Sequence, residues 1–284
     1  MEEQLQLKAA PGHDRYYTAD TYLLPSDEEE RVRLDIQHRV LTCHIPMLLP
    51  SGLTLKHGDA ILDAGTGTGI WANAVAKMVP SSVTVYGIDI ESRLFPPALP
   101  NTRFRICSTL DLPADWTCKF VYAHQRLMIL AFTQDAWAKC ISEFFRALKP
   151  GGWIRLEEYD CIRVFDGHRE PSPLYGRFLK SLEALGEKRG IASDNLLKIN
   201  GMLKHAGFED VQFTKSMVLQ CGEEARAAGM GAWRALKARF LSVGGLGLGA
   251  TAEEYDRNMD EMEEELRGSI TELMFVTWTA QKPV

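Results

Sequence analysis

Residues 61–69, ILDAGTGTG, leave few folds open to this chain, because an apolar run leads directly into three glycines at alternating positions. These glycines are Gly65, Gly67 and Gly69, and a helical pattern follows them. Glycine tolerates a positive φ and lets the backbone approach a ligand without a Cβ in the way. The first turn of the following helix offers free N–H groups to a carboxylate or a phosphate. The segment therefore predicts a strand, a ligand-binding loop and a helix in succession.

The surrounding sequence extends this unit into an α/β fold. Short β-rich apolar runs alternate with helical patterns between about residues 59 and 159, which is typical of a parallel sheet with crossover helices. The expected strands are residues 60–64, 83–89, 102–106, 119–124, 152–159, about 210–219 and a final one within 270–283. Later helices are expected at about 135–148, 174–188 and 194–205, and most of 222–268 is helical in pattern. The sequence therefore predicts a Rossmann-like, mostly parallel sheet of seven strands with helices on both faces.

Composition narrows the class of ligand. The 284 residues carry 32 Lys+Arg and 38 Asp+Glu, a formal net charge of −6, and no basic run is present. This argues against nucleic-acid binding through phosphate neutralisation. The six cysteines form no pair with metal-ligand spacing, so no metal site is expected. No stretch approaches the ~18 apolar residues of a membrane span. We therefore expect a cytosolic or nuclear protein with a small ligand.

Two carboxylates decide between cofactors. Asp89 ends the second expected strand, twenty positions after Gly69, about where an acidic residue takes a ribose diol in nucleotide-binding folds. A permissive GxGxxA match at Gly67, Gly69 and Ala72 would suit NAD. However, Asp63 lies two residues before the first glycine, where it would repel a pyrophosphate but attract an ammonium or sulfonium group. The balance favours S-adenosylmethionine.

Several motifs together resemble a known family. ILDAGTGTG, with YGIDI at residues 86–90 and LKPGG at 148–152, resembles class I S-adenosylmethionine-dependent methyltransferases. Residues 22–38, YLLPSDEEERVRLDIQH, with GTGIWA at 67–72, resemble the fungal LaeA-like branch of secondary-metabolism methyltransferases. The resemblance covers roughly residues 16–160 and extends more loosely to about 220. It implies the class I methyltransferase fold and S-adenosylmethionine as cofactor.

The resemblance also implies individual roles around the cofactor. Asp63 would contact the methionine amine, directly or through water, and Asp89 would take both ribose hydroxyls. The other expected cofactor-binding residues are Gly65, Thr66, Gly67 and Gly69 at the methionine part, Ile90, Thr109, Leu110 and Asp111 around adenine, and Tyr22 and Gln37 from the N-terminal segment. The chain departs from the branch at Cys107, where an acidic residue is usual after the third-strand isoleucine.

One catalytic candidate arises at the end of the fourth expected strand. His124 lies there, in the His-x-Arg pattern of the branch with Arg126, and the carboxyl ends of such strands face the ligand crevice. We expect His124 to act in the chemistry, or else to shape the methyl-transfer face or contact the cofactor. Of Glu157 and Glu158 on the fifth expected strand, only one should point into the crevice, because strand side chains alternate.

The remaining sequence predicts covering elements. Residues 1–57 are expected to form an N-terminal helical lid carrying Gln37 and His38, or simply a solvated helix across the sheet. Residues 58–284 would form the methyltransferase domain, with inserts at about 160–200 and 220–268. The inserts supply aromatic and thioether side chains for an apolar or aromatic acceptor, namely Phe165, Tyr175, Phe178, Met202, Met230, Trp233 and Phe240, together with Met217 from the strand between them.

The expected function is methyl transfer from S-adenosylmethionine to an O, N or S atom of a small-molecule natural product. Displacement at an activated sulfonium carbon needs alignment and exclusion of water more than a dedicated base. Two alternatives remain: a LaeA-like regulatory protein within a nuclear complex, and a cofactor-binding fold that catalyses a non-methylating step such as a pericyclic reaction.

Overall fold

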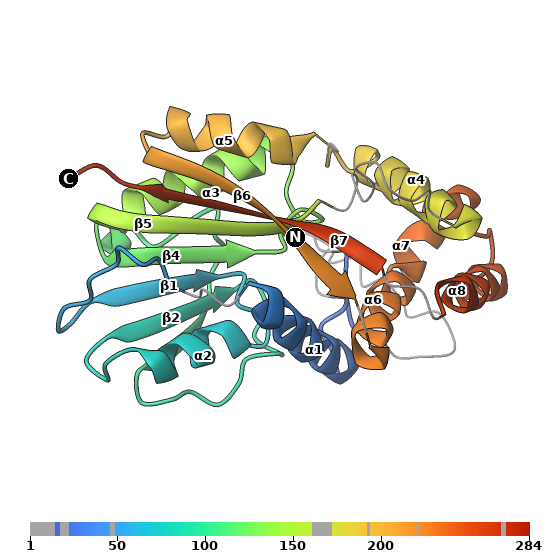
Figure 1. The fold of residues 1–284 in the computed structure, drawn as a ribbon, viewed down its shortest axis with the longest axis horizontal. Helices are drawn as coiled ribbons and strands as arrows, with labels where there is room; N and C mark the ends of the chain where they lie inside the picture. The colour runs from blue at the N-terminus through green and yellow to red at the C-terminus, as the bar shows by residue number, and fades with distance from the viewer. Residues whose placement is uncertain are drawn as a thin grey trace, which may run out of the picture.

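The computed structural model describes residues 15–17, 23–45, 49–160, 172–191, 194–220, 222–267 and 271–284. One seven-stranded sheet has the order β3-β2-β1-β4-β5-β7-β6 (Figure 1). The strands are β1 (Ala60–Ala64), β2 (Thr84–Asp89), β3 (Thr102–Ile106), β4 (Phe120–Arg126), β5 (Leu148–Tyr159), β6 (Glu209–Gln220) and β7 (Thr271–Gln281). Only β7 runs antiparallel to its neighbours. The predicted Rossmann-like, mostly parallel sheet is confirmed.

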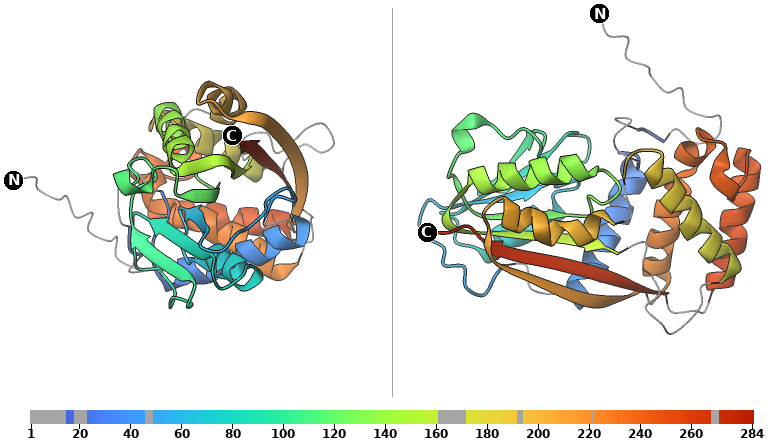
Figure 2. Two further views of the ribbon diagram at one scale, coloured as in Figure 1. Left: turned by 90° about the vertical axis from the view of Figure 1, so that its left-hand side faces the viewer. Right: turned by 90° about the horizontal axis from the view of Figure 1, so that it is seen from above.

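Helices cover both faces of the sheet and its carboxyl edge. Along the chain they are α1 (Glu28–His44), α2 (Ile70–Met78), α3 (Gln134–Ala147), α4 (Pro173–Glu187), α5 (Asn195–His205), α6 (Glu223–Ala235), α7 (Lys237–Leu241) and α8 (Ala252–Leu266), with short 3-10 turns η1 (Ala114–Trp116) and η2 (Gly245–Gly247). Helices α4, α6, α7 and α8 gather beyond one end of the sheet, and α1 lies between them and the strands (Figures 1 and 2).

The core has one apolar layer on each face of the sheet. On one face Trp71 and Val75 of α2 pack against Ile61 of β1. On the other, Ile141 and Phe144 of α3 belong to the large cluster that also holds β4, β5 and α5 residues. Every residue of β1 is buried, as expected for a central parallel strand covered on both faces. This packing fixes the carboxyl ends of β1, β2 and β4, from which the site is built.

The helices beyond the sheet share a separate core with the N-terminal segment. Leu23 joins Tyr175 and Phe178 of α4, Phe240 of α7 and Tyr255 of α8 in one buried cluster. The N-terminal residues and the predicted inserts therefore pack as one helical group, although more than 150 residues separate them in sequence. None of the helices in the described residues is long and apolar enough to cross a membrane.

Local contacts and breaks set where the helices begin and end. Helix α1 is capped by Asp27, whose carboxylate accepts the N–H of Glu30 at 3.0 Å. Trp233 and Phe240 do not share a helix, because the chain leaves the helix at Leu236 and divides the segment into α6 and α7. Phe240 is fully buried in the helical core.

Candidate active site

The glycine loop after β1 forms the base of the site. Gly67 has a φ of 51° and Gly69 a φ of 67°, conformations that side chains with a Cβ rarely adopt. A Cβ on Gly69 would lie 2.7 Å from atoms of Phe104 and Pro96. Gly69 is also the left-handed residue that begins α2. Its role is therefore close packing and turn formation, whereas Gly67 borders an open cavity.

This cavity of about 480 Å³, the glycine-loop cavity, lies at the carboxyl ends of β1, β2 and β4. Its lining includes eight of the twelve predicted cofactor residues: Gln37, Gly65, Thr66, Gly67, Asp89, Ile90, Thr109 and Leu110. Asp63, Gly69 and Asp111 are not part of the lining. Tyr22 lies outside the described residues. Segments from four separate regions of the chain therefore meet around one pocket of ligand size.

Asp89 holds the loop and faces the cavity. Its Oδ2 accepts the N–H of Gly67 at 2.9 Å, and its Oδ1 lies 3.3 Å from the N–H of Glu91. Burial raises the pKa of the Asp89 carboxyl, although these backbone N–H groups counteract part of the rise. A carboxylate fixed in this way at the end of β2 fits the vicinal hydroxyls of a ribose.

Asp63 lies beneath the loop rather than in the cavity wall. Its Oδ2 accepts the hydroxyl of Thr66 at 2.6 Å, and its Oδ1 lies 2.8 Å from Nδ1 of His124. Only 3% of Asp63 is exposed. Thr66, which lines the cavity, therefore separates the Asp63 carboxylate from a bound ligand. Asp63 can act on a ligand amine through its electric field or through water. Of the two predicted contacts, direct or through water, this position favours the one through water.

His124 is placed differently from its predicted catalytic position. It is completely buried and lines neither this cavity nor the second one described below. Its ring stacks on Trp71 with centroids 3.8 Å apart, and its Nε2 lies 3.3 Å from Oε2 of Glu157. His124 cannot touch a substrate from here. The geometry instead favours its other predicted duty, shaping the site by orienting Asp63.

The two glutamates at the end of β5 are both buried, on opposite faces of the strand. Burial alone would raise the pKa of Glu157, but hydrogen bonding and charge from His124, with the charges of Arg155 and Arg126, lower it to about 2. Glu158 bonds instead to the turn after β4. Neither carboxylate lines a cavity, and Glu157 instead forms a buried ion pair with Arg155, which gives it a structural role.

Helix α1 lies across the glycine-loop cavity and is held by polar contacts. The hydroxyl of Thr68 donates to Asp35 at 2.9 Å, and Nη2 of Arg126 donates to Nδ1 of His38 at 2.8 Å. Burial and the charge of Arg126 lower the pKa of His38 to about 4. His38 is therefore neutral near pH 7 and can accept this hydrogen bond. These contacts place Gln37 in the wall of the cavity.

Cys107 and Ser108 are among the lining residues that were not predicted. They follow β3 and border the cavity next to Thr109 and Leu110. The Ser108 hydroxyl accepts the N–H of Leu110 at 3.1 Å, and the Cys107 thiol points at the Asp111 carbonyl at 3.8 Å. Burial raises the pKa of the Cys107 thiol, so it stays neutral near pH 7. The sequence signal was available, since Cys107 follows the third-strand isoleucine directly.

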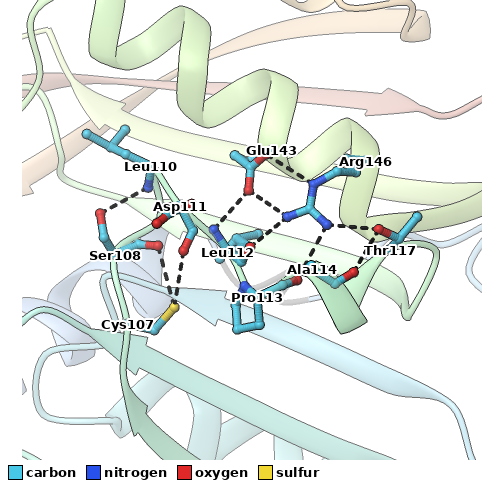
Figure 3. Close-up of polar contacts among 10 residues, drawn as sticks. All are labelled: Cys107, Ser108, Leu110, Asp111, Leu112, Pro113, Ala114, Thr117, Glu143 and Arg146. Atoms are coloured by element: carbon cyan, nitrogen blue, oxygen red, sulfur yellow. Dashed lines mark hydrogen bonds and ion pairs between the residues drawn. The ribbon is translucent and has the colours of Figure 1, made fainter.

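An ion pair on α3 holds this loop against the sheet. Glu143 and Arg146 pair at 2.6 Å, and Glu143 accepts the N–H of Leu112 at 2.8 Å (Figure 3). Arg146 donates to the Leu112 carbonyl at 2.8 Å and to the Thr117 hydroxyl at 2.9 Å. Bonds to both backbone groups of one residue fix its orientation. The pair therefore fixes the loop whose preceding residues, 107–110, line the cavity.

Replacing Arg146 with leucine should weaken S-adenosylhomocysteine binding by about fivefold, because the loop loses hydrogen bonds worth about 1 kcal/mol in a partly exposed setting. Calorimetric titration measures the change. Arg234→Leu is the matched control, since Arg234 also forms a partly exposed ion pair, with Asp260 and Glu263, and none of these three residues lines the glycine-loop cavity. Equal affinities for the Arg146 variant and the wild type would show that the ion pair does not position the loop.

A second cavity of about 540 Å³ adjoins the first, and we call it the helical cavity. Its wall is mostly apolar and comes from α1, α4, α6, α8, β7 and the turn after β4. Tyr175, Phe178, Met230 and Trp233 line it as predicted. Of the other predicted acceptor residues, Met202 packs against the sheet core, Met217 is exposed, and Phe165 lies outside the described residues.

The two cavities share part of their walls. Leu34, Gln37 and Leu127 line both of them. Gln37 is the polar side chain among the three. Leu127 has a φ of 60°, a strained conformation for leucine and one that tends to occur at functional sites. A group held in one cavity can therefore meet a group held in the other at this junction.

Known proteins share this architecture and sequence. Residues 61–152 match the methyltransferase domain family. The chain is 30% identical to methyltransferase pytC of Aspergillus terreus, with 94% of this chain and 85% of pytC covered. It is 27% identical to N-methyltransferase verN of Clonostachys rogersoniana, with 96% and 97% covered. It is 28% identical to the secondary metabolism regulator laeA of Fusarium oxysporum f. sp. lycopersici, with 95% and 91% covered.

The fold also matches a solved structure. A crystal structure named as a methyltransferase from an antibiotic biosynthesis pathway of Anabaena variabilis superposes with a TM-score of 0.53 and 16% identity, covering 87% of this chain and 98% of that one. The chain belongs to the class I S-adenosylmethionine-dependent methyltransferases, in the LaeA-like branch. Its activity is methyl transfer with S-adenosylmethionine as cofactor. The predicted family and cofactor are confirmed.

Proposed function

We propose that this chain transfers a methyl group from S-adenosylmethionine to a nitrogen atom of a mainly apolar small molecule of fungal secondary metabolism. The glycine-loop cavity would hold the cofactor and the helical cavity the acceptor. The observation that carries the proposal is the junction of the two cavities at Leu34, Gln37 and Leu127. The names of the relatives verN, sirN and gliN as N-methyltransferases support nitrogen over oxygen or sulfur.

The residues present fit this cofactor. The glycine loop leaves room where a Cβ would intrude, Asp89 offers a fixed carboxylate for a ribose, and Thr66 backed by Asp63 offers polar groups for an amino-acid end. Bound S-adenosylmethionine would supply an activated methyl group. Ile90, Leu110 and the neutral Cys107 thiol provide an apolar wall for a purine.

The protein's contribution to the reaction would be alignment of the two ligands. Helix α1 supplies Leu34 and Gln37 to the wall that both cavities share, and two groups held in position there are favoured for displacement. The shared wall offers the amide of Gln37 and the side chains of Leu34 and Leu127, none of which is a base. We therefore propose that the acceptor nitrogen reacts as a neutral nucleophile, oriented by Gln37, and that its proton leaves to water after transfer.

Incubation of the purified protein with methyl-labelled S-adenosylmethionine and a fungal metabolite extract tests the function. The expected result is label on a low-molecular-weight, organic-soluble product with a new N-methyl group. A product labelled at oxygen or sulfur would contradict the choice of nitrogen. Label found only on protein would contradict the small-molecule proposal. It would favour the regulatory alternative, since the relative laeA is named a secondary metabolism regulator.

A substitution that fills the helical cavity should reduce methyl transfer without weakening cofactor binding. Ala228 lines that cavity on α6 but not the glycine-loop cavity. Ala228→Phe is expected to reduce transfer to the labelled product at least tenfold, because steric overlap with an acceptor costs more than about 1.4 kcal/mol. S-adenosylhomocysteine should bind as in the wild type.

Ala252→Phe is the matched control, since Ala252 lies on α8 and lines neither cavity. It should leave transfer and binding unchanged. Full transfer by the Ala228 variant would place the acceptor elsewhere. A parallel loss of S-adenosylhomocysteine affinity would mean that the two cavities do not hold separate ligands.

A further inference from the structure

One turn lies between the two cavities, next to Leu34 and Gln37 of α1. It comprises residues 127–133 between β4 and α3, and we call it the partition turn. Leu127, Ile129 and Leu130 face the helical cavity, whereas Leu127, Met128, Ala131, Phe132 and Thr133 face the glycine-loop cavity. The position of this turn therefore sets how far apart two ligands lie.

The partition turn has few bonds of its own. The N–H groups of Ala131 and Phe132 both donate to the Met128 carbonyl, at 2.9 and 3.1 Å. At its start, the N–H of Leu127 donates to the Glu157 carbonyl at 2.9 Å. Leu127 is held there with a φ of 60°, and a leucine keeps that conformation only when its surroundings impose it.

The side chain of Glu158 bonds to the two residues that follow Leu127. One carboxyl oxygen accepts the N–H of Met128 at 2.7 Å and the other accepts the N–H of Ile129 at 3.1 Å. Glu158 is fully buried on β5, and no other function in the site has been assigned to it. Hydrogen bonds between a buried side chain and the backbone order the segment that they hold. Two such bonds hold consecutive residues of the turn.

Burying a carboxyl group has a cost that an apolar side chain would avoid. Burial, with the charge of neighbouring Glu157, raises the pKa of Glu158 to about 8, although the hydrogen bonds from the two backbone N–H groups counteract part of the rise. A residue that merely filled space here would be expected to be apolar. The contacts of Glu158 go to the backbone of the turn, which indicates what the carboxyl group does.

Resting on the methyl transfer proposed above, we infer that Glu158 is a positioning residue: by accepting the N–H groups of Met128 and Ile129 it fixes the partition turn, and with it the alignment of cofactor and acceptor across the junction at Leu127. Glu158 touches neither ligand. Glu158 acts on the reaction through the backbone of the turn. Replacing it should therefore change the relative affinities of different cofactor analogues, and not only the stability of the protein.

The affinities of two cofactor analogues can report the position of the partition turn without any acceptor being present. Sinefungin carries an amino group where S-adenosylmethionine carries its transferable methyl group, and S-adenosylhomocysteine carries nothing there. The ratio of their dissociation constants therefore reports the space beside the junction. In Glu158→Gln, one oxygen remains to accept an N–H, while the new NH₂ group faces the other. The ratio is expected to change about fivefold or more from the wild type as the turn shifts.

Amide hydrogen exchange provides the second measurement on the same variant. Exchange in the segment 127–133 should speed up by about tenfold while the strands of the sheet keep their wild-type protection. Glu158→Asp, which keeps the carboxyl group but withdraws it by one methylene, is the second variant if the glutamine variant does not fold. It is expected to change both readouts in the same direction.

Asp59→Asn is the matched control. The buried Asp59 carboxylate also accepts a backbone N–H, from Lys56 at 2.7 Å, but lies at the opposite end of β1 and lines neither cavity. It should lower stability and leave the affinity ratio unchanged. A folded Glu158 variant with a wild-type ratio would overturn the inference, and so would an equal change of ratio in the Asp59 variant. Because neither readout involves methyl transfer, such a result would leave the proposed function standing.

Discussion

Replacing Asp89 with alanine is expected to weaken S-adenosylhomocysteine binding by on the order of 100-fold or more. Hydrogen bonds to a charged group contribute about 1.5–3 kcal/mol each, and two ribose hydroxyls would lose their partner. The variant also frees the N–H of Gly67, which Asp89 now fixes at 2.9 Å. Calorimetric titration measures the affinity directly, and circular dichroism checks that the sheet remains.

Asp111→Ala is the control for this variant. Asp111 was also predicted to contact the cofactor, but the structure leaves it exposed and outside the lining of the glycine-loop cavity. Its replacement should change the affinity by less than about twofold. An unchanged affinity in the Asp89 variant, or a large loss in the Asp111 variant, would remove Asp89 from the ribose position.

Gly67→Val is expected to weaken S-adenosylhomocysteine binding about as much as the Asp89 variant does. Gly67 has a φ of 51°, a conformation that costs a β-branched residue on the order of 1–3 kcal/mol. The new side chain would also lie against Leu34 of α1, with its Cβ 3.5 Å from Cδ1, and narrow the cavity under the helix. Either the loop would change shape or the ligand would lose its approach to the backbone.

The same change at Gly201 separates this local effect from a general one. Gly201 lies on α5, has no atom within 4 Å of an added Cβ, and needs no positive φ. Gly201→Val should keep wild-type affinity for S-adenosylhomocysteine. If the Gly67 variant bound as well as the Gly201 variant, the loop would not be the cofactor site.

Local patterns carried much of the fold prediction. The run into Gly65 and Gly67 predicts a strand and loop from a few adjacent residues, because the steric demands of that turn act over short range. Asp89 was predicted from its distance to that loop, since a parallel βαβ unit fixes where the second strand ends. The order of the later helices followed from the helical periodicity of apolar residues and from the glycine and proline residues that end helices.

Long-range packing determined what the sequence could not predict. His38 and Arg126 are 88 positions apart, and only the folded chain brings them together. The burial of His124 depends on Trp71 lying across its ring. The strand-end rule places a residue near the crevice but does not say whether its side chain reaches the cavity. The helical cavity is formed by helices whose relative placement has no signature in any one of them.

A cofactor in the glycine-loop cavity is expected to present its sulfur to the junction with the helical cavity. A crystal structure of the protein soaked with S-adenosylhomocysteine tests this most directly. We expect the ribose hydroxyls on Asp89, the purine beside Ile90 and Leu110, and the sulfur facing the shared wall at Leu34, Gln37 and Leu127. A ligand bound outside this cavity, or with its sulfur directed away from the shared wall, would contradict this placement of the cofactor and the acceptor.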